Sequence, residues 1–213
     1  MRTPAHFPLR RLVVLLILFA FLITTPAFCQ QAPIQLPTPQ ISGGMPLMQA
    51  LAQRKTARTF RDQPLSRQML SNLLWAAFGV NRPRDIKPGL GRTAPSAMNR
   101  QEVELYVVLA DGAYVYDAEK HLLNPLVAGD VRGKISPPAA AHAAVTIVYV
   151  APAGNQFAQV DTGFIGKNVY LFAASEGLNA WFYTGHGMDV AGAIKLPADK
   201  QVLYLQSAGY PPG

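Results

Sequence analysis

Three cations and a hydroxyl fall within five positions of the segment Arg54-Lys55-Thr56-Ala57-Arg58. Arg54 and Arg58 are four residues apart, so on a helix or its frayed end their side chains would point the same way. An arginine grips two phosphate oxygens at once, a lysine adds a compact charge, and Thr56 adds a neutral donor. The segment therefore predicts a phosphate site, although a solvated basic face leading into a turn would have the same composition.

Two further segments carry candidate binding groups. Residues 91–101 include Pro95-Ser96-Ala97-Met98-Asn99-Arg100-Gln101, a turn-rich stretch between an amphipathic helix and a strand. Residues 161–177 are apolar almost all round, which predicts a helix inside a core or between subunits. Asp161 would cap the start of this helix, and Gly177 would end it.

The three segments, in this order and spacing, resemble the flavin-dependent nitroreductase superfamily, particularly its SagB-type dehydrogenase branch. The family's R-[RHK]-[ST]-x-[RK]-x-F element matches residues 54–60, and its P-S-x-x-N-x-Q segment matches residues 95–101. Residues 161–178 look like the family's central helix, although Lys167 stands where a Gln is common. The resemblance covers residues 46–210.

The resemblance implies an FMN site. Arg54, Lys55 and Thr56 would hold the phosphate and ribityl end, and Arg58 would lie toward the N1/O2 edge of the ring. A cation at that edge would stabilise the negative charge that reduction places there. The flavin would carry the chemistry, so no side chain is expected to act as a catalytic acid or base.

The remaining cofactor contacts implied by the resemblance come from two other places. A partner subunit of a homodimer would supply Pro95, Ser96, Ala97 and Asn99, and the segment Tyr183-Thr184-Gly185 would present backbone N–H groups to flavin N5 and O4. Gly185 would allow a close backbone approach. A plain turn at Pro95-Ser96 and a simple strand end at Thr184-Gly185 are the alternatives.

Other kinds of site find little support. The four histidines, His6, His121, His142 and His186, lack metal-ligand spacing such as H-E-x-x-H, so no metal site is expected. The acids form no paired-carboxylate motif. Apart from residues 54–58 the basic residues are scattered, which argues against a nucleic-acid surface.

Residues 1–29 have the features of a secretory signal peptide: arginines, an apolar run from Leu12 to Ile23, and small residues at Ala27 and Cys29. Cleavage after Cys29 would lower the net charge from +7 to +4 and leave no cysteine. The protein is then expected to be exported, in a bacterial periplasm; an uncleaved membrane anchor is the alternative. Residues 30–45 are rich in Pro and Gly and predict an extended linker.

Residues 46–213 are expected to form one α+β domain with a nitroreductase-like fold, in which helices flank a central mixed or antiparallel sheet and two copies intertwine. Helices are predicted at 46–55, at 67–78 with Ser66 as N-cap and Gly79 as terminator, and at 189–194. Strands are predicted at 102–110, 113–116, 144–150, 180–184 and 202–207, with a hairpin at Asp111-Gly112.

The function expected from the sequence is an exported, homodimeric, FMN-dependent oxidoreductase. It would transfer two electrons through flavin N5 to or from a small organic substrate such as a quinone or a nitroaromatic. The family typically takes hydride from NAD(P)H, which an exported protein would not normally meet, so the electron donor stays open. The alternative is a non-catalytic FMN-binding protein, either a flavin store or a structural dimer.

Overall fold

The computed structural model describes residues 31–82, 91–185 and 189–213. The predicted signal peptide and His186 therefore lie outside the described residues. Residues 31–213 form one compact unit. Within the described ranges, no helix is both long enough and apolar enough to cross a bilayer.

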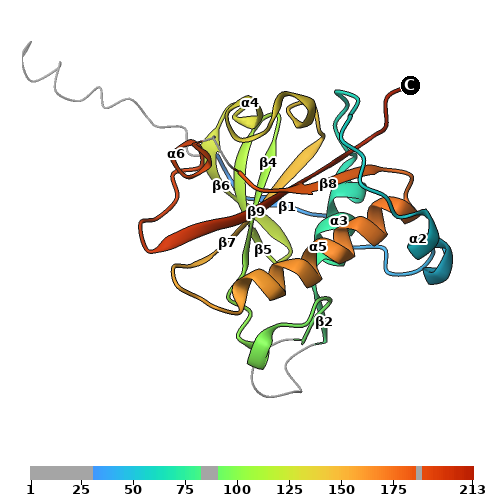
Figure 1. The fold of residues 1–213 in the computed structure, drawn as a ribbon, viewed down its shortest axis with the longest axis horizontal. Coiled ribbons are helices and arrows are strands. Elements are labelled where there is room, and N and C mark those ends of the chain that lie inside the picture. The colour runs from blue at the N-terminus through green and yellow to red at the C-terminus, as the bar shows by residue number, and fades with distance from the viewer. Residues whose placement is uncertain (1–30, 83–90, 186–188) are drawn as a thin grey trace, which may run out of the picture. The chain divides into compact units, whose positions relative to one another are not determined.

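A seven-stranded sheet forms the centre of this unit, in the order β1-β6-β5-β4-β7-β9-β8 (Figure 1). Every neighbouring pair in it is antiparallel, so the sheet is antiparallel rather than mixed. The hairpin at Asp111-Gly112 is confirmed, with Leu109 opposite Gly112. The strand bounds are β1 Ile34–Gln35, β4 Glu104–Leu109, β5 Gly112–Asp117, β6 Leu122–Ala128, β7 Val145–Pro152, β8 Asn179–Tyr183 and β9 Lys200–Gly209; a separate hairpin pairs β2 Val80–Arg82 with β3 Gly91–Arg92.

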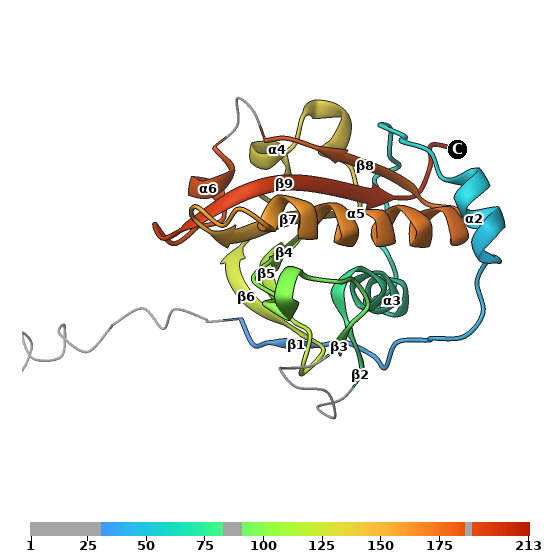
Figure 2. The ribbon, with the colours of Figure 1, turned by 60° about the horizontal axis from the view of Figure 1, so that its bottom comes forward.

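Helices cover both faces of the sheet (Figure 2), and the sheet separates two hydrophobic cores, one on each face. The long helices α3 (Arg67–Phe78) and α5 (Ala158–Ser175) pack on one face, against side chains such as Val107 and Ile147. The short helices α4 (Arg132–Ile135) and α6 (Val190–Ala193) pack on the other face, against Val108 and Val148. Side chains of neighbouring strand residues point to opposite faces, so each strand contributes to both cores.

The helix predicted at 67–78 has the bounds of α3. Ser66 caps it, its hydroxyl accepting a hydrogen bond from the backbone N–H of Met69 at 3.1 Å, and Gly79 follows its last turn. Leu70, Leu73 and Leu74 are buried against the sheet.

Residues 31–45, which we call the N-terminal strap, are extended as predicted but are held to the domain rather than free of it. β1 pairs with β6, and Leu36 is buried. The Gln40 N–H donates to Asn72 Oδ1 on α3 at 2.9 Å, and the Met45 N–H donates to Ser175 Oγ on α5 at 2.7 Å. Backbone bonds to two helices and a strand make the strap a part of the fold.

His121 supports the strap through a hydrogen-bond chain that fixes its tautomer. Ser71 Oγ donates to the Pro37 carbonyl at 2.6 Å, so it accepts from His121 Nε2–H at 2.7 Å. The Tyr116 hydroxyl then donates to His121 Nδ1 at 2.9 Å. This arrangement needs a neutral imidazole, and burial lowers the pKa of His121 in agreement with it.

The hydrogen bonds of His121 predict that the protein loses stability in mild acid. Because its pKa is lowered on folding, the unfolded chain binds more protons below the ordinary histidine pKa of about 6.5. The stabilisation is complete above that pH and is lost as the pH falls toward the folded pKa. Urea unfolding at pH 7.5 and pH 5 measures the difference in the free energy of unfolding between the two pH values. His121→Gln should reduce this difference, and the substitution of the exposed His142 by Gln should leave it nearly unchanged. An equal pH difference in His121→Gln would contradict this origin.

Candidate functional site

The candidate site lies along the outer edge of β8, the last strand of the sheet. Residues 54–58 run beside this edge, and the Ala57 N–H donates to the Ala180 carbonyl at 2.9 Å. The helix α2 (Leu47–Gln53) ends before Arg54, whose ψ of 122° is extended, so the helix predicted to reach Lys55 is two residues too long. The helical repeat that would have pointed Arg54 and Arg58 the same way is therefore absent.

Tyr170 of α5 contacts two of the predicted phosphate residues. The guanidinium carbon of Arg54 lies 5.4 Å from the centre of the Tyr170 ring, a cation–π contact. The Tyr170 hydroxyl lies 3.0 Å from Thr56 Oγ1 and accepts a hydrogen bond from the Phe182 N–H at 2.9 Å. One tyrosine therefore joins residues 54–56 to β8.

Arg58 is supported by a different ring. Its guanidinium carbon lies 5.5 Å from the centre of the Trp181 ring on β8, and Trp181 packs against Tyr183 and the buried Phe60. The two arginines predicted to act together thus lie on separate aromatic supports. Arg54 is half-buried and Arg58 is exposed.

Two hollows flank Tyr170. The first, the Arg54 hollow, is an open depression of about 510 Å³ lined by Arg54, Gly163, Gly166, Lys167, Tyr170 and Phe182. The second, the Lys55 hollow, has a volume of about 400 Å³ and is lined by Gln53, Lys55, Tyr170, Ala173, Ala174, Gly177, Leu178, Asn179 and Pro211. None of the described residues that line the two hollows is acidic, and each hollow contains at least one cation, so both favour an anion.

The other end of β8 holds Tyr183, Thr184 and Gly185. Ala180 and Phe182 direct their backbone groups to the outer edge, and the same alternation places the backbone of the exposed Thr184 there. The extended backbone rises by four residue steps, roughly 13 Å, from Ala180 to Thr184. Thr184 and Gly185 border a further hollow of about 510 Å³.

Gly185 has a packing role that the sequence did not predict. A Cβ at this position would lie 3.0 Å from both Leu205 Cδ1 and Val190 Cγ2, a tight contact that would force these side chains to shift by a few tenths of an ångström. The Tyr183 side chain is anchored on the opposite side, where its hydroxyl lies 2.9 Å from Ser207 Oγ and 3.1 Å from Ser136 Oγ. Burial raises the pKa of Tyr183, so the group is a neutral anchor.

The predicted residues 95–99 lie elsewhere, at the start of α5. They include the short 3₁₀ helix η1 (Ala97–Asn99). The Ala97 N–H donates a hydrogen bond to Asp161 Oδ1 at 3.0 Å. Asp161 therefore does not cap α5, which begins three residues earlier at Ala158; its buried carboxylate holds this loop. A rise of nine residues along the helix, roughly 13 Å, separates Asp161 from Tyr170, so within one chain residues 95–99 lie away from Tyr170 and its contacts to residues 54–56.

Two helices carry exposed apolar side chains. On α2 these are Leu47, Met48 and Leu51, and on α5 they are Val160 and Phe164. Met48 is 75% exposed and Phe164 is 45% exposed, although both are large and apolar. Large apolar side chains exposed in this way are candidates for an interaction surface.

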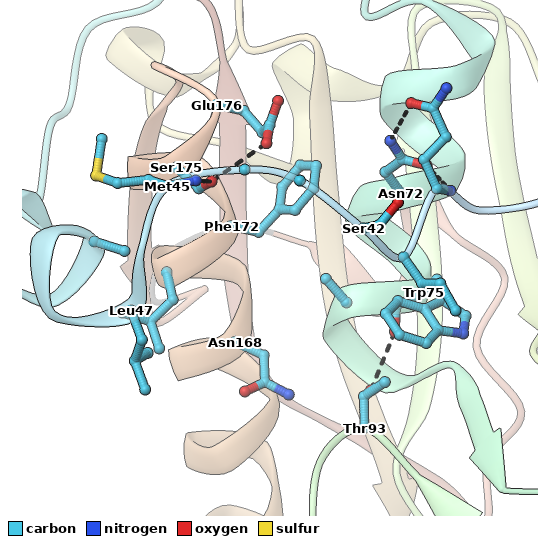
Figure 3. A pocket seen from close by; sticks show the side chains of 17 residues that line it. Ser42, Met45, Leu47, Asn72, Trp75, Thr93, Asn168, Phe172, Ser175 and Glu176 are labelled. Atoms are coloured by element: carbon cyan, nitrogen blue, oxygen red, sulfur yellow. Dashed lines mark hydrogen bonds between the residues drawn. The ribbon is translucent and has the colours of Figure 1, made fainter.

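A separate groove lies between α3 and α5, beneath the strap (Figure 3). It has a volume of about 460 Å³, and Trp75, Asn168 and Phe172 are among the residues that line it. Thr93 closes one end by donating its hydroxyl to the Trp75 carbonyl at 3.1 Å. None of the predicted cofactor residues borders it.

Two glycines of α5 form a matched pair for testing the packing of this helix on β8. A Cβ on Gly166 would lie 2.8 Å from the Phe182 ring, whereas a Cβ on Gly163 would meet nothing within 4 Å. We expect Gly166→Ala to lower the free energy of unfolding by about 1–3 kcal/mol through overpacking. Gly163→Ala should raise it by up to about 1 kcal/mol, because alanine favours the helix. Urea unfolding checks both; equal effects would contradict the close Gly166–Phe182 contact.

Sequence analysis missed four residues of the site: Lys167, Tyr170, Trp181 and Phe182. On α5 the sequence did offer a signal for this part of the site, because Gly163 and Gly166 lie close to Lys167, which stands where the family commonly has a Gln. Nothing in the sequence pairs Tyr170 with Thr56, because that contact spans 114 residues. Among the described residues, no group of His, Cys, Asp or Glu could hold a metal ion.

An antiparallel sheet covered by helices on both faces, with cationic residues beside its β8 edge, defines an α+β protein. The chain belongs to the nitroreductase family, whose model matches residues 51–210. It is an oxidoreductase of that family.

Similar proteins and solved structures agree with this family assignment. A protein of Methanocaldococcus jannaschii, provisionally named a nitroreductase, is 29% identical over 153 residues, which cover 62% of this chain and 75% of the relative. The crystal structure of a provisionally named nitroreductase of Ralstonia eutropha is 33% identical, with a TM-score of 0.76 over 87% of this chain and 92% of that one. An FMN-dependent nitroreductase of Clostridium difficile shares the fold at 17% identity, with a TM-score of 0.53 over 78% of this chain and 88% of that one.

Proposed function

We propose that this protein binds FMN along the β8 edge and moves two electrons between a donor and a small organic substrate, such as a quinone or a nitroaromatic. Within the family, the residues of the 54–60 and 95–101 segments favour the SagB-type branch. The observation that carries the proposal is the pair of cation-lined hollows at one end of an open strand edge.

The residues present fit a flavin nucleotide. Arg54, Lys55 and Lys167 surround the end of the edge where Tyr170 lies, and they would hold the phosphate with the Thr56 hydroxyl. The other end offers the backbone of Thr184, and no strand of the described residues pairs with the outer side of β8. Bound FMN would supply hydride transfer at N5.

The protein's own groups would bind, orient and tune the cofactor. Arg58, held on Trp181, places a fixed positive charge between the two ends of the edge. Tyr183 and Gly185 would fix the backbone around Thr184 through part-buried hydrogen bonds and close packing. No side chain of the site is assigned a proton-transfer role.

A homodimer would complete the site. The exposed apolar residues of α2 and α5 supply a surface for a second copy, and a two-fold axis across α5 would bring one protomer's residues 95–99 toward the other's residues 54–58. Pro95, Ser96, Ala97 and Asn99 are therefore proposed as cofactor contacts from the partner. The protein is proposed to act after export, in the periplasm or anchored by its N-terminal segment, where a quinol or a partner protein could replace NAD(P)H as donor.

The alternative is an FMN-binding protein without turnover. The open Arg54 hollow favours it, because an open site selects substrates weakly. One experiment tests both: purify the full-length protein, record its visible spectrum, reduce it with dithionite under anaerobic conditions, and add a quinone. Reoxidation faster than that of free FMN is the result expected of the enzyme, and an unaccelerated rate would leave the binding protein. A protein that neither carries nor takes up FMN would overturn both.

A further inference from the structure

Tyr170 occupies the centre of the candidate site. It is the residue shared by the linings of the Arg54 and Lys55 hollows. It lies on α5, is half-buried, and contacts both β8 and residues 54–56. Any ligand in either hollow would therefore lie beside this side chain.

The Tyr170 oxygen takes part in two hydrogen bonds, and in the one with Thr56 either hydroxyl can be the donor. The Phe182 N–H donates to this oxygen at 2.9 Å, so the phenol proton is available for Thr56 Oγ1 at 3.0 Å. When Thr56 accepts that proton, its own O–H is left to donate elsewhere. Thr56 is exposed, so its hydroxyl can reach an anion held at the edge.

The Tyr170 ring acts on a second group. Arg54 lies over it with its guanidinium carbon 5.4 Å from the ring centre. Stacking on an aromatic face leaves the N–H groups at the rim of a guanidinium free for a ligand. The backbone of Arg54 is fixed as well, since its N–H donates to the Ala50 carbonyl at 2.9 Å.

We propose that Tyr170 is a positioning residue for the phosphate of the cofactor: its hydroxyl orients Thr56, its ring supports Arg54, and the Phe182 backbone on β8 anchors it. This role rests on the proposed FMN site. Tyr170 thereby ties the phosphate-binding residues to the strand that continues to Thr184. It acts through Thr56 and Arg54, so its effect depends on the phosphate group.

The proposal is tested by comparing FMN with riboflavin, which lacks the phosphate. Apoprotein of the full chain is titrated with each flavin, and quenching of flavin fluorescence gives the two dissociation constants. We expect Tyr170→Phe to weaken FMN binding about tenfold, the equivalent of one lost hydrogen bond, and to leave riboflavin binding nearly unchanged. Thr56→Ala should have the same effect, and Thr56→Ser should retain FMN binding.

A double-mutant cycle tests whether the two hydroxyls act together. If Tyr170 works through Thr56, the double variant Tyr170→Phe with Thr56→Ala binds FMN no more weakly than the weaker single variant. Tyr204→Phe is the matched control: Tyr204 packs on the same Phe182 ring at 4.9 Å, but its hydroxyl lies outside the Tyr170–Thr56 pair, so wild-type affinities are expected.

Three results separate the outcomes. Equal losses of FMN and riboflavin affinity in Tyr170→Phe, or additive losses in the cycle, would overturn the positioning role and leave the FMN site intact. Unchanged FMN affinity in Tyr170→Phe would do the same. A wild-type protein that binds neither flavin would overturn the FMN site itself, and the role of Tyr170 with it.

Discussion

The variant Arg54→Ala with Arg58→Ala is expected to purify colourless, with FMN affinity lowered about a hundredfold or more. A hydrogen bond to a charged group contributes about 1.5–3 kcal/mol, and each 1.4 kcal/mol is a factor of ten in the dissociation constant. Neither guanidinium makes an ion pair with a described residue in the 31–82, 91–185 and 189–213 ranges, so both are available to a ligand. Visible absorbance of the purified protein and FMN titration of the apoprotein measure the effect.

A control variant removes two positive charges elsewhere. Arg67→Ala with Lys134→Ala changes exposed residues on α3 and α4 that line neither the Arg54 hollow nor the Lys55 hollow. This protein should remain yellow, which separates a local loss from a general fall in net charge. Full flavin occupancy in the Arg54/Arg58 variant would contradict the assignment of the phosphate site.

Local signals in the sequence were sufficient for several elements. The bounds of α3 follow from Ser66, Gly79 and the apolar repeat between them, all of which act within one helix. The β4–β5 hairpin follows from Asp111-Gly112 and the apolar strands on either side. Such features are predictable because their causes lie a few residues apart.

The strand β6 was missed, because Pro125 interrupts a run of mixed polarity. The strand tolerates this proline beside a register shift in its pairing with β5. Its other neighbour, β1, comes from the strap, which appeared to be a linker because its prolines hide any apolar repeat. Pairing partners far apart in the chain decided both strands.

The site was predictable in composition but not in geometry. The residues 54–58 lie at one end of the β8 edge, and Thr184 and Gly185 lie at the other; their contacts to FMN stay a prediction. The sequence did not show that Arg54 and Arg58 rest on Tyr170 and Trp181, because these contacts depend on how α5 and β8 pack. The motifs predict which residues face a ligand, whereas the rings that support them are brought there by the fold.

The proposed homodimer predicts a large effect at Phe164, which is exposed on α5. Phe164→Lys should give a monomer, because a two-fold axis places the new charge in the interface twice, at about 3–5 kcal/mol for each unpaired charge. Lysine is preferred to aspartate, since Lys167 lies one turn away and would neutralise an acid. Sedimentation velocity measures the mass of the assembly.

The same substitution tests whether residues 95–99 act across the dimer. If they contact the partner's cofactor, the monomer has half a site, and FMN should be lost together with the second copy. Ala139→Lys adds the same charge at an exposed position on the 3₁₀ helix η2 (Pro138–Ala140) and should leave a yellow dimer. A monomeric Phe164→Lys protein that binds FMN as tightly as wild type would place the whole cofactor site within one chain. In that case the bond from Ala97 to Asp161 would only shape the start of α5. Roughly 13 Å of helix separates Asp161 from Tyr170, so residues 95–99 would not reach the phosphate end of the site within one chain.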